Sequence, residues 1–482
     1  MPVGSSLVWF RQDLRLDDNP ALQAALKTGL PIYCVFIWDE TTPSFAQPGG
    51  ASQWWLHQSL TKLNEALCKR GNHLLFYRGK PQDILVELIG KTNAKAVYWN
   101  RCYDMHSIER DKKIKKALLQ DNIDAQSFNS HLLFEPWTIV SQTGHPYKVF
   151  TPFWKKVCLT SDAQWPRTHL AAKKIFCAES FPRSELLSDW QLVPKKPNWA
   201  KQFVNYWHPG EEGAHKRLDY FIDHGLYDYK EGRNFPAQQN VSGLSPHLHW
   251  GEIAPWRVWN ALETALSRDA RLSTANVENF QSELGWREFS YNLLYHFPSI
   301  PTENFRKQFD HFSWATNKKA LLAWQQGQTG YPLVDAGMRQ LWQMGWMHNR
   351  VRMVVASFLV KNLRLHWHHG ARWFWDTLVD ADLANNSASW QWVAGCGVDA
   401  VPYFRIFNPV TQSSKFDANG EYIRRWVPEL APLDNKSIHC PWKVAPEILQ
   451  KAGIVLGRNY PWPIVDHNES RLAALVAFKK LK

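Results

Sequence analysis

Long apolar runs are missing from this sequence of 482 residues, and none reaches the length of about 18 that a membrane-spanning helix requires. The first residues also lack the basic and then apolar segments of a secretion signal. The seven cysteines are scattered without a CxxC pair, and no HExxH motif occurs, which argues against a disulfide framework and a bound metal. We therefore expect a soluble, cytoplasmic protein with reduced thiols and no metal.

Acidic residues are too few to balance the basic ones: 44 stand against 56, so the net charge is +12. The excess suits a polyanionic partner such as nucleic acid, although a featureless basic surface would have the same charge. What the chain has in quantity is tryptophan, with 27 indoles against 15 tyrosines. Indoles usually pack in cores, and they can also stack on nucleobases.

The first 130 residues alternate short apolar runs with amphipathic stretches. The apolar runs predict buried strands at 7–10, 31–38, 74–77 and 96–99. The stretches between them predict helices at 19–28, 52–70, 81–89 and 107–120. This alternation indicates a doubly wound parallel sheet of the Rossmann-like type, which binds ligands at the carboxyl ends of its strands. The segment has no GxGxxG and no phosphate-loop motif, so it does not identify a nucleotide.

The rest of the chain differs in character. Residues 131–200 are rich in Pro, Lys and Ser and weakly periodic, which predicts a long connector. Residues 201–482 are aromatic and mostly of helical period. Helices are predicted at 211–225, 252–267, 275–295, 317–327, 332–344, 346–363 and 371–380. We therefore predict an α/β domain at 1–130, a connector at 131–200 and an all-α domain at 201–482.

One helical segment, residues 280–289 (FQSELGWREF), mixes charge with aromatic rings. Its spacing brings Glu283, Trp286 and Arg287 to one face of a helix. An exposed ion pair beside a packed indole would show the same spacing. The segment is a candidate site in which carboxylate, indole and guanidinium act together.

A second segment, residues 345–353 (GWMHNRVRM), places two arginines in an otherwise apolar helix. Arg350 and Arg352 need carboxylate partners there, and Asp380 and Asp382 are candidates. A purely structural network of salt bridges is the alternative.

The third segment, residues 380–392 (DADLANNSASWQW), contains a polar run that would be expensive to bury without a hydrogen-bonding ligand. Its two indoles, Trp390 and Trp392, bracket a glutamine. Packing explains most such pairs, and stacking on a nucleobase is the functional alternative.

Taken in order, these segments resemble the photolyase/cryptochrome flavoprotein family. The likeness extends to residues 8–20 (VWFRQDLRLDDNP), 242–252 (SGLSPHLHWGE), 329–338 (TGYPLVDAGM) and 399–409 (DAVPYFRIFNP). It is most detailed for bacterial cyclobutane-dimer photolyases, and the motifs run from residue 7 to the last helices.

The resemblance implies two cofactors. One is a U-shaped FAD in the helical domain, and the other is an antenna pigment in the α/β domain, with methenyltetrahydrofolate preferred over a deazaflavin. The implied FAD contacts are Tyr229, Ser242, Leu244, Ser245, Arg287, Arg352, Asp380, Asp382 and Asn386. Within this set, Asn386 faces flavin N5, and Arg352 pairs with Asp380 against the flavin ring.

The implied activity is light-driven DNA repair. Excited, fully reduced FAD passes an electron to a pyrimidine dimer flipped out of the duplex, the cyclobutane ring splits, and the electron returns. Glu283, Asn349 and Met353 would touch the dimer, and Trp286 and Trp392 would wall its pocket. The other implied roles are phosphate binding by Arg350, Arg405 and Lys415, and electron relay to oxidised flavin by Trp390, Trp367 and Trp314, with Trp342 and Trp346 as candidates for a second branch.

Residue identities indicate which family members the chain is most like. Relatives that repair the six-four photoproduct carry two histidines where this chain has Asn349 and Met353, which favours the cyclobutane dimer. Signalling cryptochromes often have Asp or Cys in place of Asn386 and a long tail, and this chain ends at Lys482 soon after its helical region. We expect a monomeric enzyme that binds UV-damaged DNA. A blue-light receptor and a basic DNA-binding protein without catalysis are the alternatives.

Overall fold

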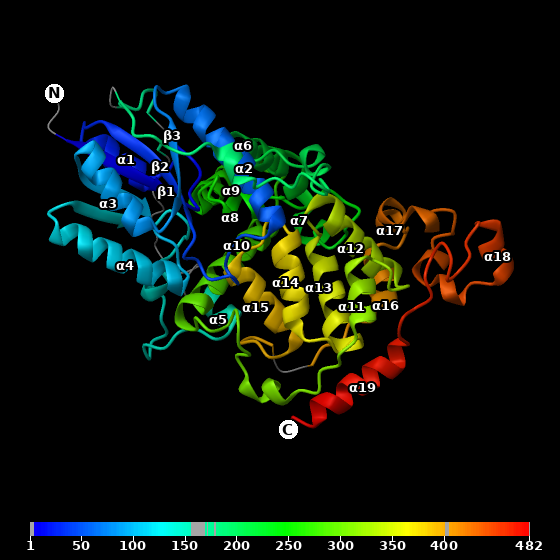
Figure 1. Ribbon diagram of the computed structural model, residues 1–482. Helices are drawn as coiled ribbons and strands as arrows, with labels where there is room; N and C mark the ends of the chain where they lie inside the picture. The colour runs from blue at the N-terminus through cyan, green and yellow to red at the C-terminus, as the bar shows by residue number, and fades with distance from the viewer. Residues whose placement is uncertain (1–3, 156–168, 171, 178–179, 401–403, 482) are drawn as a thin grey trace.

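Five parallel strands form a sheet in the order β3-β2-β1-β4-β5 near the N-terminus (Figure 1). The computed structural model describes residues 4–155, 169–170, 172–177, 180–400 and 404–481. The strands are β1 (Ser5–Phe10), β2 (Ile32–Asp39), β3 (Leu74–Gly79), β4 (Ala94–Asn100) and β5 (Asp124–Phe128). The helices between them are α1 (Pro20–Lys27), α2 (Gly50–Cys68), α3 (Pro81–Thr92) and α4 (Met105–Gln120).

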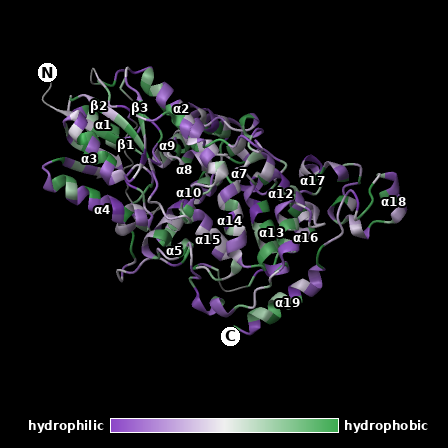
Figure 2. Ribbon diagram, viewed as in Figure 1, coloured by the Kyte–Doolittle hydropathy of each residue, from purple (hydrophilic) through white to green (hydrophobic). Residues whose placement is uncertain are grey.

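Helices cover both faces of this sheet. Val8 and Phe10 pack on the side of α1 and α2, whereas Leu7 and Trp9 pack on the side of α3 and α4. Because both faces are buried, the strands are continuous apolar runs, as is usual in parallel sheets. The predicted doubly wound α/β fold is confirmed. Figure 2 shows hydrophobic residues along the strands and hydrophilic residues over much of α4 and α18.

Beyond β5, the described part of the chain forms helices joined by loops. Its longer helices are α6 (Glu211–Tyr220), α9 (Pro255–Arg268), α10 (Thr274–His296), α11 (Lys318–Gln325), α12 (Pro332–Met344), α13 (Asn349–Ser357), α14 (Trp367–Thr377), α15 (Leu383–Ala394), α16 (Pro409–Phe416) and α19 (His467–Lys479). Its short helices are α5 (Phe150–Phe153), α7 (Tyr229–Gly232), α8 (Ser245–His249), α17 (Glu421–Trp426) and α18 (Pro446–Lys451). The predicted combination of α/β and all-α parts is therefore confirmed.

Several predicted boundaries were wrong. Strand β5 was not predicted, because its sequence DAQSF is mostly polar and only Ala125 is deeply buried. The helix predicted at 371–380 spans Trp367–Thr377, and the one predicted at 346–363 is α-helical only over Asn349–Ser357 before it widens into a π-turn. Helix α15 was missed because its polar first turns hide the amphipathic period.

Buried polar contacts join the sheet domain to the helical region. The Trp55 indole N–H on α2 donates to the Glu252 carboxylate at 3.0 Å, and the same carboxylate accepts the Gly210 N–H at 2.8 Å. The Gly50 N–H at the start of α2 donates to Asp376 at 2.9 Å. These contacts fix the sheet domain against the helices that surround the site described below.

Three expectations concern features of the whole chain. No helix in the ranges given above is both long enough and apolar enough to cross a membrane. Six of the seven cysteines are free thiols, and Cys158 lies outside the described residues. Parts of the predicted connector and residues 401–403 of the segment 399–409 also lie outside them.

Candidate functional site

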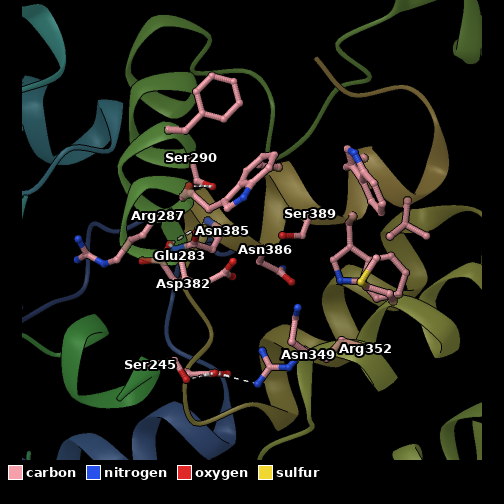
Figure 3. Close-up of a pocket in the computed structure, with 18 of the residues that line it drawn as sticks. Ser245, Glu283, Arg287, Ser290, Asn349, Arg352, Asp382, Asn385, Asn386 and Ser389 are labelled. Carbon is pink, nitrogen blue, oxygen red and sulfur yellow. Dashed lines mark hydrogen bonds and ion pairs between the residues drawn. The ribbon is translucent and has the colours of Figure 1, made fainter. Parts of the chain in front are cut away.

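A cavity of about 750 Å³ opens among α7, α8, α10, α13 and α15. Figure 3 shows polar side chains of α8, α10, α13 and α15 around one space, with Asn386 on α15 and Asn349 on α13 both directed inward. Most of the predicted site residues line it: Tyr229, Ser242, Ser245, Glu283, Trp286, Arg287, Asn349, Arg350, Arg352, Met353, Asp380, Asp382, Asn386, Trp390 and Trp392. Residues far apart in sequence thus meet at one site.

Five predicted residues do not line the cavity. Leu244 is buried behind it, and its backbone N–H donates to the Ser242 hydroxyl at 3.3 Å. Arg405 and Lys415 are exposed, with their charges beside the Trp392 and Phe416 rings. The remaining two, Trp314 and Trp367, belong to the aromatic series described below.

One wall of the cavity is built on the Asp380 carboxylate. One of its oxygens accepts the Ser245 hydroxyl at 2.6 Å and an Arg352 N–H at 2.8 Å, which confirms the expected Arg352–Asp380 pair. The other oxygen is buried and has no hydrogen-bond partner within the described chain. A buried carboxylate oxygen is costly to leave unpaired, so this atom is suited to accept a hydrogen bond from a ligand.

A second buried carboxylate, Asp382, caps α15. One oxygen accepts both N–H groups of Asn385, at 2.9 Å from the backbone and 2.7 Å from the side chain. The other accepts the Tyr291 hydroxyl and a His249 ring N–H at 3.2 Å. Burial alone would raise the pKa of Asp382, but these hydrogen bonds and the nearby Arg287 charge hold that pKa below its ordinary range.

The segment 241–245 forms a small cradle beside the cavity. The Arg217 guanidinium on α6 donates to the carbonyls of Ser242 and Val241, at 2.5 and 3.2 Å. Gly243 has φ of +64°, and a Cβ at that position would lie 2.8 Å from the guanidinium. Glycine therefore lets the backbone and Arg217 approach closely, and the guanidinium fixes the loop beside the cavity.

The charges on α10 do not pair with each other, as the exposed-pair alternative would require. Glu283 does not pair with Arg287 and instead forms an ion pair with Arg233, just after α7, whose guanidinium also donates to Asn279 at 3.1 Å. The Arg287 guanidinium turns inward and donates to the His131 carbonyl at 2.7 Å. The exposed-pair alternative is therefore wrong, because both side chains line the cavity with partners from distant segments. No spacing rule links Arg233 to Glu283, which is why sequence reasoning missed it.

The aromatic wall of the cavity is supported from the connector. The Phe150 ring lies parallel to Trp286 with ring centroids 3.7 Å apart. The Phe150 N–H donates to Asp399 at 3.3 Å, and Asp399 lines the cavity mouth. This stack leaves one face of Trp286, which is 38% exposed, open to a ligand.

Three indoles on different elements lie between the cavity and the surface: Trp390 on α15, Trp367 at the start of α14 and Trp314 just before α11. The Trp390 ring lines the cavity and packs on the backbone of Gly370. Trp367 lies one turn before Gly370 on α14 and is buried. The His366 ring lies between Trp367 and the partly exposed Trp314, at centroid distances of 5.8 and 4.9 Å. Trp367 and Trp314 are thus linked through the His366 ring, and Trp390 packs on the helix that carries Trp367; the electron relay through the three stays a prediction.

The candidate second branch of the electron relay consists of Trp342 and Trp346, and these two indoles have different neighbours. Trp346 lines the cavity and packs against Trp207, whereas Trp342 is 47% exposed and stacks between Trp199 and Trp373. Its role stays a prediction.

The contact of Trp390 with Gly370 leads to a stability prediction. A Cβ on Gly370 would lie 2.0 Å from the Trp390 ring, so Gly370→Ala must displace the indole or the helix. We expect a loss of about 1–3 kcal/mol in unfolding free energy. Gly90→Ala is the matched control: nothing lies near a Cβ there, on the exposed face of α3, and a gain of about 0.5–1 kcal/mol is expected. Equal stabilities in urea denaturation would contradict this packing.

Comparison with known proteins accounts for this geometry. Residues 6–172 match the family model for DNA photolyase, and residues 280–480 match the model for the FAD binding domain of DNA photolyase. The chain belongs to the photolyase/cryptochrome family. A deoxyribodipyrimidine photo-lyase of Agrobacterium fabrum is 48% identical over 476 residues, covering 99% of this chain and 98% of that protein.

Two further relatives place the chain within the photolyase/cryptochrome family. The crystal structure of a bacterial class III photolyase from Agrobacterium tumefaciens superimposes with a TM-score of 0.96 at 47% identity, covering 100% of this chain and 98% of that one. Cryptochrome-1 of Arabidopsis thaliana is 38% identical over 480 residues, covering 97% of this chain and 69% of the cryptochrome. The predicted family membership is confirmed.

The cavity residues fit the FAD that this family binds. Its volume lies within the usual range for small-molecule sites, about 300–1,000 Å³. The unpaired oxygen of Asp380 can accept a hydrogen bond from a ring N–H, and the Ser242 hydroxyl, in the part of the cradle that lines the cavity, can donate to a phosphate. FAD is therefore the cofactor that this donor set suits.

A possible metal site lies elsewhere. Asp17, Glu211 and His215 come together at the junction of the sheet domain with α6, outside the cavity. Glu211 already accepts the backbone N–H groups of Leu16 and Asp17, at 2.9 and 2.8 Å, and an Arg257 nitrogen lies 3.6 Å from Asp17. The Arg257 guanidinium thus already places a positive charge beside the Asp17 carboxylate. The expected lack of a metal stays a prediction.

Proposed function

We propose that this protein is a deoxyribodipyrimidine photo-lyase, an enzyme that uses light to split cyclobutane pyrimidine dimers in DNA. One observation carries the proposal. The dimer-side residues Glu283, Asn349 and Met353 line the same cavity as the flavin-side pair Arg352–Asp380. A flipped-out lesion and a flavin can therefore occupy neighbouring halves of one space.

The cofactor supplies the hard chemistry: bound FAD, when reduced and excited by light, provides the electron that splits the ring. The protein binds and orients. In our proposal Glu283, held by Arg233, presents a carboxylate to the base edges of the dimer. Trp286 and Trp392 offer apolar faces for the two bases, a contact worth about 1–3 kcal/mol per base. On the flavin side we propose that Asn386, whose side-chain N–H₂ donates to the Ala371 carbonyl at 3.1 Å, faces N5.

We assign the remaining flavin contacts to the other cavity residues and to the cradle. They are Tyr229, Ser242, Ser245, Arg287, Arg352, Asp380 and Asp382, with Leu244 acting from behind the wall to shape the loop. Phosphates of the DNA strand would be held by Arg350 within the cavity and by the exposed Arg405 and Lys415 at its rim.

The choice of lesion follows from two side chains. Asn349 and Met353 stand one helical turn apart on α13, where six-four repair would require histidines. Neither side chain can act as a titrating acid near neutral pH, so the proposal is restricted to cyclobutane dimers, which need no proton donor of that kind.

The antenna pigment is a separate proposal. We retain methenyltetrahydrofolate in the α/β domain over a deazaflavin, as the resemblance suggests. The division at residues 130 and 200, a monomeric state and a cytoplasmic location likewise stay predictions from the sequence.

Recovery of thymine absorbance tests the proposed function. We expect the purified protein to carry FAD, and the reduced protein under blue light to restore dimer-containing oligonucleotide to intact thymine. The same mixture kept dark is the control. A flavin-containing protein that is photoreduced normally but repairs no dimer would favour the cryptochrome alternative, and a colourless protein would leave only a DNA-binding role.

A further inference from the structure

The Arg350 guanidinium lies in the cavity without a carboxylate partner among the described residues. Nearby, Arg233 is paired with Glu283. Arg352, two residues further along α13, is paired with Asp380. Burial and the Arg233 charge lower the pKa of Arg350, but a guanidinium stays charged at any physiological pH. A partly buried cation that no anion of the chain offsets is costly, unless a ligand supplies the anion.

The helix that carries Arg350 does not offset this charge either. Arg350 lies in the first turn of α13, where the positive end of the helix dipole disfavours a cation. His348 caps this helix and is neutral, because burial lowers its pKa to about 3. Arg350 therefore gains no electrostatic stabilisation from its own helix.

Two side chains from other elements hold the guanidinium in place. One N–H of Arg350 donates to Oδ1 of Asn234, just after α7, at 2.5 Å. The ring centroid of Phe416, the last residue of α16, lies 4.4 Å from the guanidinium carbon. Both partners are neutral, so they fix the position of the guanidinium without cancelling its charge.

The Asn234 amide is itself oriented by the backbone. Its Nδ2 group donates to the carbonyls of Lys230 and Glu231 near the end of α7, at 3.4 and 3.2 Å. An amide has its donors at one end and its acceptor at the other. The two carbonyls therefore turn Oδ1 of Asn234 toward Arg350.

The guanidinium keeps donors free for a ligand. Its Nε–H is buried and has no partner within the described chain. Another N–H faces the sulfur of Met353 at 3.9 Å, and a thioether is only a weak acceptor. A fixed, planar guanidinium with free N–H groups suits the oxygens of a phosphate.

We propose that Asn234 is a positioning residue for DNA binding, which together with Phe416 holds the unpaired Arg350 guanidinium ready for a phosphate beside the flipped-out dimer. The proposal rests on the proposed function, because the DNA strand supplies the phosphate. An arginine that is already held in one orientation loses less side-chain entropy when it binds. Asn234 thereby favours binding without touching the DNA itself.

Asn234→Ala tests the proposal in a double-mutant cycle with Arg350→Met. Binding of the holoprotein to a duplex oligonucleotide with one cyclobutane dimer is followed in the dark by fluorescence anisotropy. We expect Asn234→Ala to weaken binding about 3- to 10-fold in the wild-type background and less than about 2-fold in the Arg350→Met background. A merely structural effect on α7 would weaken binding equally in both backgrounds. Asn205→Ala is the matched control, because this exposed amide bonds to Gln202 outside the cavity, and it should bind like wild type.

Phe416→Leu provides a second cycle with Arg350→Met. Its effect should shrink in the Arg350→Met background without vanishing, because Lys415 also lies 5.3 Å from the Phe416 ring centroid. Arg350→Met alone should reduce the slope of log affinity against log salt by about 0.9, the value for one phosphate contact.

Equal losses from Asn234→Ala in the two backgrounds, or no loss in either, would overturn the proposal. An unchanged salt slope for Arg350→Met would overturn it as well, since Arg350 would then contact no phosphate. A wild-type protein that binds the dimer-containing duplex but leaves it unrepaired under light would contradict the repair function alone.

Discussion

Trp390→Phe is expected to reduce photoreduction of oxidised flavin to near background while leaving repair by chemically pre-reduced protein largely intact. Trp390 is the relay indole that lines the cavity, and it connects through the Gly370 backbone to Trp367. Phenylalanine keeps most of the packing volume but is far harder to oxidise than indole. The electron supply from the surface is therefore cut at its last step, beside the cavity, whereas the light-driven step from reduced flavin does not use it.

The measurement is flavin absorbance during illumination with an external reductant, followed by the repair assay on protein reduced in the dark. Trp324→Phe is the control: its ring lies 6.4 Å from Trp390 but off the series toward Trp314. It should photoreduce like wild type. Photoreduction of Trp390→Phe at the wild-type rate would refute the relay, and loss of repair by the pre-reduced variant would show that the substitution damages the cavity instead.

The strands and the doubly wound order could be predicted because burial of a strand directly restricts which residues it can contain. Strands covered on both faces must be apolar at consecutive positions, as at 31–38. Strand β5 lies at the sheet edge, where one neighbour suffices, and its polar sequence shows no such restriction. Strand β3 lies at the other edge but begins with an apolar run, and it was predicted, so what local patterning misses is a strand of polar sequence.

Helix α15 illustrates a different limit. Its first turn contains Asn385 and Asn386, and Asp382 caps it. Asp and Asn are residues that are also common in loops, so this stretch reads as a loop in the sequence. Those residues are polar because they face a ligand cavity, so the helix departs from an amphipathic period where it matters for function. The unusual composition identified the site even though it concealed the helix.

Most site residues were predicted from the family resemblance. The residues that hold them in place were not predicted. Arg233 reaches Glu283 from the end of α7, and Phe150 reaches Trp286 from the connector. Arg233 and Glu283 are 50 residues apart in the sequence, and Phe150 and Trp286 are more than one hundred apart. Helical spacing relates only residues three or four apart. Such pairs follow from tertiary packing and become visible only in the folded chain.

Glu283→Ala is expected to reduce the repair rate of pre-reduced protein about 10- to 100-fold. A hydrogen bond that involves a charged group is worth about 1.5–3 kcal/mol, which corresponds to that factor in rate if it is lost in the reacting complex. The Arg233 guanidinium, which is mostly buried, also loses its carboxylate and is left to Asn279. Glu283→Gln keeps the shape and a hydrogen-bonding edge, so it should retain an intermediate rate.

The comparison should be made at saturating dimer-containing DNA, so that a change in affinity does not imitate a change in rate. Glu278→Gln is the control, because Glu278 is an exposed carboxylate on the same helix. It removes one negative charge from α10 without touching the cavity and should repair like wild type. If Glu283→Ala also repaired like wild type, the carboxylate would have no part in the reaction. If Glu278→Gln lost as much activity as Glu283→Ala, the effect would belong to the charge of α10 and not to the cavity.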